Sequence, residues 1–365
     1  MKAAMQNTSA RHSSRWAALG GLATAGVAAL ITVAAAQAPS AALLVVLRSE
    51  PGGPILAIVD PGTGKVSGRV PIGTDPHGVA VSEDGKLAFV ANTNGHNQTI
   101  PEGDSLSVVD IAARKEVRRV EIGQGTRPHD VHVVGGKVYF SASGFKALGR
   151  YDPARNKVEY FGLGQNGPHM LTVSRDAKTI FAANNGSGTV SVIEGAGPPD
   201  WKVTSIAIGG VPEGTDMSPD GKQVWTVSEE GGTVTIFDVA TKKVTETLKV
   251  QTDHANRLKF TPNGKQVIVL DREIGDVVVI DAATRQVAKR IKMAGDKPGV
   301  AMGLGDLALV PDSSRVYVTV DARAAGGRHY IAVIDLKTLA MTSRIETTTF
   351  GDGLAWAAPN TKSSD

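Results

Sequence analysis

One pattern recurs seven times along this chain of 365 residues: an alternating apolar segment that ends in an acidic residue. The intervals between successive copies are 50, 42, 42, 44, 43 and 54 residues, and the copies end at Asp60, Asp110, Asp152, Glu194, Asp238, Asp281 and Asp335. A regular period of this length indicates one supersecondary unit copied along the chain. The acid suits the start of a turn, because its side chain accepts hydrogen bonds from amides two residues on.

A second signal precedes each copy. The segments SEDGKLAFVAN (82–92), SPDGKQVWTVS (218–228) and TPNGKQVIVLD (261–271) place Asp-Gly or Asn-Gly between apolar runs, which predicts a β-hairpin. Each unit then holds four short strands in about 45 residues, the size of one propeller blade, with no room for a helix. The sequence therefore predicts an all-β fold, a seven-bladed β-propeller with four-stranded blades.

The two ends of this repeat array fit together. The segment 41–47 reads as a second strand with no innermost strand before it, and 351–356 reads as a spare innermost strand. Placed side by side, they complete the seventh blade. We expect the C-terminal strand to join the N-terminal blade and close the ring, so that no blade edge is left unpaired.

These repeats resemble a known family. The strand sequences FVAN (89–92), FAAN (181–184) and VYVTV (316–320), with Pro-His-Gly (76–78) and Ser-Pro-Asp-Gly (218–221), resemble the YVTN-type repeat of bacterial β-propellers. The resemblance covers nearly all of the chain after residue 40. It implies a seven-bladed exported protein, often periplasmic or on the cell surface. Lactonases are similar in architecture, as more distant relatives, and they use polar groups at the central opening.

The first 38 residues have the composition of an export signal. Lys2, Arg11 and Arg15 precede an apolar run over 16–36, and Ala36-Gln37-Ala38 matches a signal-peptidase site. We expect cleavage after Ala38, a single propeller domain over 39–365 and a periplasmic location, with secretion or surface display as alternatives. The run is also long enough to span a bilayer as an uncleaved anchor. The rest of the sequence has no second run of this kind, so no stable membrane span is expected after cleavage.

Composition excludes several kinds of chemistry. The chain has no cysteine, which rules out disulfides, thiol nucleophiles, Cys-ligated metals and c-type haem attachment. It has no P-loop, so no nucleotide cofactor is indicated. Removal of residues 1–38 takes away three basic residues and no acidic ones, which leaves 36 of each. A neutral domain has no overall field to attract nucleic acid, and nucleic acid is not expected as a partner.

The innermost strand of each blade lines the central channel, and one residue of each should lie at the channel mouth. Aligning these strands on the hairpins that follow them puts His77, His129, His169, Glu213 and Asn256 there, then Gly305 or Asp306, and Asp352 or Gly353. Strand side chains alternate, so residues two positions earlier share this side and add Asp75, Arg127 and His254. Asp271 and Arg272 follow a neighbouring strand at the same face.

Four of the seven histidines after residue 38 fall in this register. Imidazoles and a carboxylate suit a divalent transition metal ion such as Zn²⁺, Cu²⁺, Ni²⁺ or Fe²⁺, with His77, His129, His169, Glu213 and His254 as its ligands. The residues expected to bind a small molecule are Asp75, Arg127, Asn256, Asp271 and Arg272. A structural role for the repeated histidines is the competing interpretation.

Two further functions stay open. His169, Glu213 and Arg127 are candidate catalytic residues of a lactonase-like hydrolase or lyase, in which a histidine acts as general base. Alternatively, the insertions 93–105, 294–306 and 321–329 form a lid or a docking rim at the mouth, and the protein is an interaction platform for another envelope protein.

Overall fold

The computed structural model describes residues 41–93, 104–195, 200–293 and 302–358. The chain divides into two units, residues 1–37 and 38–365, and the described residues all belong to the second. The predicted signal peptide and most of the insertions at 93–105 and 294–306 lie outside them. In the described part, no helix has the length and apolar character that a membrane crossing requires.

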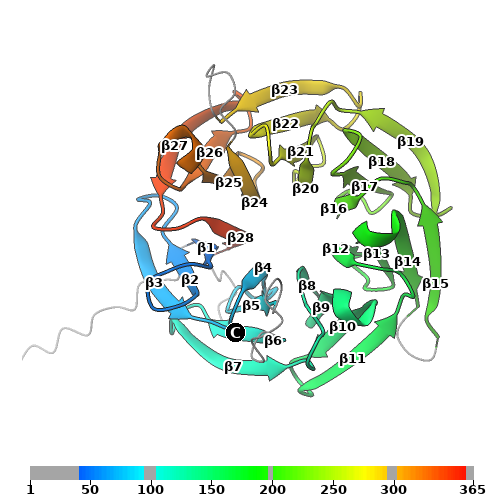
Figure 1. Cartoon of the computed structure of the whole chain (residues 1–365), viewed down its shortest axis with the longest axis horizontal. Coiled ribbons are helices and arrows are strands. Elements are labelled where there is room, and N and C mark those ends of the chain that lie inside the picture. Colours follow the sequence, from blue (N-terminus) through cyan, green and yellow to red (C-terminus); the bar gives the residue numbers. More distant parts are fainter. Residues whose placement is uncertain (1–40, 94–103, 196–199, 294–301, 359–365) are drawn as a thin grey trace, which may run out of the picture. The chain divides into compact units, whose positions relative to one another are not determined.

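The described residues form seven sheets of four strands each, as the repeat predicts, around a central axis (Figure 1). Blade 1 comprises β28 (Gly351–Ala357), β1 (Ala42–Leu47), β2 (Ile55–Val59) and β3 (Val66–Pro71). Blade 2 comprises β4 (Pro76–Val81), β5 (Leu87–Asn92), β6 (Ser105–Asp110) and β7 (Lys115–Glu121). Blade 3 comprises β8 (Val131–Val134), β9 (Lys137–Ala142), β10 (Ala147–Asp152) and β11 (Lys157–Gly162).

The remaining four blades repeat this order. Blade 4 comprises β12 (Pro168–Val173), β13 (Thr179–Asn184), β14 (Thr189–Glu194) and β15 (Lys202–Ala207). Blade 5 comprises β16 (Pro212–Met217), β17 (Gln223–Ser228), β18 (Thr233–Asp238) and β19 (Lys243–Lys249). Blade 6 comprises β20 (Ala255–Phe260), β21 (Gln266–Asp271), β22 (Asp276–Asp281) and β23 (Val287–Lys292). Blade 7 comprises β24 (Gly303–Leu309), β25 (Arg315–Asp321), β26 (Tyr330–Asp335) and β27 (Ala340–Glu346). Short 3₁₀ turns are η1 (Ser143–Phe145), η2 (Asn185–Ser187) and η3 (Arg323–Ala325).

Blade 1 closes the ring in the way the sequence predicts. The C-terminal strand β28 pairs antiparallel with β1, with Leu43 opposite Trp356 and Val45 opposite Leu354. The innermost strand of this blade therefore comes from one end of the described chain and the other three strands come from the other end. Closure leaves every blade with neighbours on both sides.

The repeated acids set the turns between the third and fourth strands. The Oδ1 atom of Asp60 accepts hydrogen bonds from the amides of Gly62 and Thr63 at 2.9 and 2.7 Å. Asp281 and Asp335 accept the equivalent bonds from residues two and three positions on. These bonds satisfy backbone donors that the sheet leaves unpaired, which explains why an acid recurs at this position.

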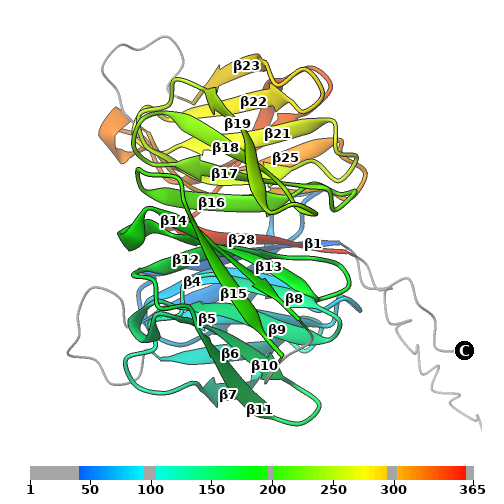
Figure 2. The same ribbon diagram turned by 90° about the vertical axis from the view of Figure 1, so that its right-hand side faces the viewer.

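Apolar side chains fill the spaces between adjacent blades. One cluster joins Trp225 and Val227 of blade 5 to Leu258 and Val267 of blade 6, all at most 2% exposed. Figure 2 shows the ring from the side: inner strands such as β12 and β16 run nearly straight across it, whereas the outer strands β11 and β15 are tilted. This is the twist expected of a sheet, and it lets neighbouring blades pack face to face.

Carboxylates also connect neighbouring blades near the channel. The side chains of Asp130 and Asp306 accept hydrogen bonds from the amides of Leu171 and Leu354, each on the innermost strand of the next blade, at 2.9 Å. Glycine allows the closest of these approaches: a Cβ atom on Gly353 would lie 2.1 Å from the carbonyl oxygen of His77. The innermost strands are therefore held close together around the axis.

Candidate functional site

The structure gathers one residue of every blade around a cavity of about 470 Å³ at one end of the channel. These seven residues are His77, His129, His169, Glu213, Asn256, Gly305 and Asp352. They resolve the two ambiguous positions, because Gly305 and Asp352 line the cavity. Asp306 instead makes the inter-blade hydrogen bond described above. The other lining residues are Arg48, Thr93, Arg127, Ser143, Gly167, Asn185, Glu229, Arg257 and Arg272.

The three histidine rings form a continuous stack along one side of the cavity. The centroids of His77 and His129 are 4.4 Å apart and those of His129 and His169 are 3.8 Å apart, with interplanar angles of 35° and 32°. The stack arises because three consecutive blades carry Pro-His at the start of the innermost strand (β4 and β12) or just before it (β8). His129 occupies the middle, with an imidazole on each face.

A carboxylate lies at each end of this stack. Nδ1 of His77 is 2.9 Å from Oδ2 of Asp352, and Nδ1 of His169 is 2.5 Å from Oε2 of Glu213. Each carboxylate has a second partner: Arg48 donates to Asp352 at 2.7 Å, and the Asn185 side-chain amide donates to Glu213 at 3.1 Å. Such partners fix the orientation of a histidine ring.

The central ring is the exception. The environment of His129 lowers its pKa well below the usual value, first through loss of contact with solvent and then through the charges of His169 and His77. The ring keeps some contact with the cavity, and its Nδ1 atom has no hydrogen-bond partner among the described residues. At neutral pH the stack therefore has an uncharged imidazole between two imidazoles that face carboxylates.

The surroundings of the two carboxylates favour their charged forms. Burial by itself raises the pKa of Asp352, but the contact with His77 and the charges of Arg48 and Arg257 outweigh it and hold the pKa well below its usual range. Glu213 behaves in the same way, because His169 and Arg257 more than offset its burial and lower its pKa. Both groups are therefore anionic at neutral pH.

The strand alternation used on the sequence did not place Arg257 in the cavity. It follows Asn256 directly and would point away from the channel in a regular strand. The register of β20 against β21 shifts between Ala255 and Arg257, which is a β-bulge, so regular alternation does not hold across these residues. Arg257 is buried, and its Nε atom lies 3.5 Å from Oδ1 of Asp306. This Nε atom has no hydrogen-bond partner among the described residues.

Arg48 was also missed, because it follows the second strand of blade 1 rather than an innermost strand. Its guanidinium reaches Asp352 and also Asp75. The basic residue at the end of an inner strand was the available sequence signal. Without the neighbouring carboxylates, however, nothing in the sequence distinguishes it from an exposed loop residue.

Of the other predicted residues, two line the cavity, two lie beside it and one lies away from it. Arg127 and Arg272 line the cavity as exposed side chains. Asp75 stands beside it and pairs with Arg48, whereas His254 pairs at 2.8 Å with Glu229, which does line it. Asp271 does not line the cavity: its carboxylate is fully buried and accepts hydrogen bonds from the amides of Asp253 and His254 at 2.8 and 3.1 Å.

The predicted metal ligands are therefore only partly brought together. His77, His129, His169 and Glu213 share one wall, but the rings lie against one another at tilts of 35° and 32°, and two of them are already paired with carboxylates. Within the described residues, no three histidine or acidic side chains are grouped so that they could hold a metal ion. His254 contacts the cavity through Glu229 rather than directly.

The cavity as a whole suits a polar ligand. Four guanidinium groups and three histidines face three carboxylates, and Arg257 Nε, His129 Nδ1 and Asn256 Oδ1 lie there without hydrogen-bond partners within the described residues. Buried polar atoms that lack partners are costly, so a ligand that satisfies them gains affinity. Fold and site together define a seven-bladed β-propeller with a polar cavity at its channel mouth.

Comparisons with known proteins agree with the fold. The Kuenenia stuttgartiensis hydrazine synthase structure matches with a TM-score of 0.61 and 21% identity, over 77% of this chain and 89% of that chain. A candidate 6-phosphogluconolactonase from Bacteroides fragilis matches with a TM-score of 0.66 and 14% identity, over 87% and 98% of the two chains. A protein of unknown function from Desulfotomaculum acetoxidans matches with a TM-score of 0.68 and 14% identity, over 87% and 99%.

At these identities the likeness extends to the fold alone. A scan against models of protein families finds no match, and no curated protein sequence matches this chain.

Proposed function

We propose that this protein binds a small anionic molecule at the channel mouth. One observation carries the proposal: Arg257 and His129 are held at the cavity wall with Nε and Nδ1 atoms that lack hydrogen-bond partners within the described residues. Arg257 supplies a charged donor in a place of low dielectric constant, where an anion interacts strongly with it. The rim residues Arg127 and Arg272 add positive charge at the entrance.

The two histidine–carboxylate pairs set the shape of this site. Asp352 and Glu213 face the two ends of the stack. Arg257 is ion-paired with Asp306 at 3.5 Å, but its Nε donor has no hydrogen-bond partner among the described residues. We therefore expect a ligand with one carboxylate or phosphate group directed at Arg257, and hydroxyl groups that bond to Asn256 and His129. A sugar acid has this chemistry.

The test is isothermal titration calorimetry with gluconate, succinate and inorganic phosphate, and with glucose as the uncharged comparison. His129→Asn is the site variant, because the repeat itself carries Asn at this position in blade 6. His132→Asn is the matched control, since this histidine lies three residues further along the chain, on β8, and lines a different cavity. We expect at least one anion to bind, and we expect the His129→Asn substitution to lower the affinity for it by about tenfold. If none of the anions binds, or if both variants bind equally well, the proposal is wrong.

A divalent transition metal ion is the second proposed occupant, with His77, His129, His169 and Glu213 as its nearest side chains. The stacked rings give it less support than they give a small anion. Titration of the same protein with ZnCl₂, without a histidine tag, measures this separately. Tight binding that is lost in His169→Gln would favour the metal over the anion.

A lactonase-like hydrolase is the alternative that one contact favours. Glu213 holds Nδ1 of His169 at 2.5 Å, which orients the ring and leaves Nε2 for proton transfer. In this reaction His169 takes a proton from water, the hydroxide adds to the lactone carbonyl, the ring C–O bond breaks and the alkoxide receives the proton. Turnover of glucono-δ-lactone should then fall in Glu213→Gln much more than binding does. Equal turnover in this variant and the unaltered protein would reject the assignment.

Membership of the YVTN-type family and export to the periplasm belong to the same proposal. Family membership rests on the repeat strands, and export rests on residues 1–38. We also propose that the insertions dock another envelope protein. Fractionation of cells that express the full chain tests the location. Recovery from the cytoplasm with residues 1–38 still attached would contradict it.

A further inference from the structure

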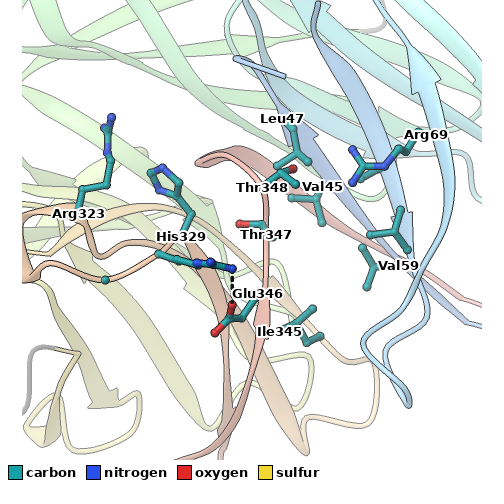
Figure 3. A pocket seen from close by; sticks show the side chains of 14 residues that line it. Val45, Leu47, Val59, Arg69, Arg323, His329, Ile345, Glu346, Thr347 and Thr348 are labelled. Carbon is teal, nitrogen blue, oxygen red and sulfur yellow. Dashed lines mark ion pairs between the residues drawn. The ribbon is translucent and has the colours of Figure 1, made fainter. Parts of the chain in front are cut away.

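A second cavity of about 480 Å³ lies between blade 7 and blade 1, the two blades that meet where the ring closes. Its walls are aliphatic and come from both blades: Val45 and Leu47 on β1, Ala57 and Val59 on β2, and Ile345 on β27. Figure 3 shows Val45, Leu47 and Val59 on the right-hand side of the cavity and the polar side chains Arg323 and His329 on the left.

Blade 7 departs from the repeat at one position that lines this cavity. Just after the fourth strand of each blade, one residue donates its backbone N–H to the carbonyl of a residue just before the third strand. In six blades this residue is aliphatic or methionine, and packs between the blades: Ile72, Ile122, Leu163, Ile208, Val250 and Met293. In blade 7 it is Thr347, which donates to His329 at 3.0 Å and lines the cavity.

Loss of the aliphatic side chain at such a position is costly, because the surrounding core collapses only in part. The neighbours of Thr347 have not closed the space. Val45, Leu47 and Val59 are at most 2% exposed and yet line it, which means that the cavity is set into the core between the blades. An apolar space of this kind binds apolar groups well.

Positive charge gathers where the cavity opens. Three arginines line it, Arg69, Arg323 and Arg328, with Glu346 as the one carboxylate among the lining residues. Carboxylates behind the rim hold two of these arginines: Glu50 bonds to Arg69 at 2.8 Å, and Asp321 bonds to Nε and Nη2 of Arg323. Arg328 meets Glu346 at 3.9 Å, and its side chain is 85% exposed. A guanidinium has five N–H donors, so each arginine keeps donors that these carboxylates do not use.

We propose that this inter-blade cavity binds a small amphipathic anion, an aliphatic carboxylate whose chain lies against Val45, Leu47 and Val59 and whose head group lies near Arg328. This site is separate from the channel mouth and does not depend on the proposed function. The aliphatic walls favour the chain over a sugar, and the arginines favour a carboxylate over an alcohol or an amine.

Octanoate is the probe, titrated calorimetrically into the full chain and compared with octanol and octylamine. The key variant is Thr347→Ile, which restores the side chain that the other blades carry and fills the cavity. It should weaken octanoate binding by at least about tenfold while raising the melting temperature by about 2–4 °C. Arg328→Gln should weaken octanoate and leave octanol unchanged.

The matched control is Met293→Ile, at the same repeat position in blade 6, and it should leave octanoate binding unchanged. If Thr347→Ile fails to fold, Thr347→Val serves in its place. The proposal is overturned if octanoate does not bind the unaltered protein at millimolar concentration, or if octanol or octylamine binds as tightly as octanoate does. It is also overturned if the Thr347→Ile substitution has no effect on octanoate binding. Loss of gluconate binding in these variants is not expected, so the two sites fail independently.

Discussion

The imidazole of His129 should make the folded protein sensitive to mild acid, and His129→Asn measures how much. The ring lies between His77 and His169, at 4.4 and 3.8 Å, and removal from solvent together with their charges lowers its pKa. In the unfolded chain a histidine takes up a proton near pH 6.5. Below that pH the unfolded state binds more protons at this side chain than the folded state does, so the free energy of unfolding falls as the pH falls.

The size of the effect follows from this one proton. A full difference of one proton between the two states corresponds to a slope of about 1.4 kcal/mol per pH unit. The His129 ring keeps some contact with the cavity, where water screens the charges, so this slope is an upper limit. The carboxylates Asp352 and Glu213 have lowered pKa values and add their own loss of stability only at still lower pH, as they become protonated.

Urea unfolding followed by tryptophan fluorescence provides the assay. Above pH 7 the free energies of unfolding of the unaltered protein and of His129→Asn should change with pH in parallel, because His129 is neutral in both the folded and the unfolded state. Between about pH 5 and pH 6.5 the unaltered protein should lose stability faster than His129→Asn, by as much as about 1.4 kcal/mol per pH unit. Equal slopes in this range would refute the reasoning, since the ring would then be protonated in the fold as readily as in the unfolded chain.

Three further outcomes are expected. Gly353→Ala should lower the stability by about 1–3 kcal/mol in thermal unfolding, because its Cβ would lie 2.1 Å from the His77 carbonyl oxygen; Gly162→Ala, where a Cβ meets nothing within 4 Å, is the control that should stay within about 0.5 kcal/mol. Deletion of 351–365 removes the strand that closes blade 1 and should abolish cooperative unfolding as seen by circular dichroism; an unchanged transition would mean that closure contributes little. N-terminal sequencing of exported protein should begin directly after Ala38, and an intact N-terminus would identify an anchor instead.

The positions of the channel-mouth residues were predictable because they are local to each repeat. His77, His129 and His169 share the context of a proline before them and a hairpin after them. Aligning the blades therefore places all three at one end of the channel, where the structure has them. The same alignment left Gly305 and Asp306 ambiguous, because neither blade 7 nor blade 1 carries this context.

Other features of the site depend on irregularities that repeat counting does not register. Arg257 lies at a β-bulge and lines the cavity, which strict alternation of strand side chains does not anticipate. Asp271 was expected to bind a ligand because it ends an inner strand. Instead, its carboxylate is turned back to satisfy the backbone of the preceding loop.

By itself, the sequence determined the number of blades, the closure of the ring and the residue that five of the seven blades present at the mouth, because backbone hydrogen bonding and turn formation act over a few residues and repeat with the chain. Tertiary structure alone decided which of these residues contact one another. Asp352 meets His77, and Thr347 leaves a space against Val45, only when the ends of the chain are brought together. Such contacts depend on the size and charge of neighbours that lie hundreds of residues away in the sequence, and no local pattern contains that information.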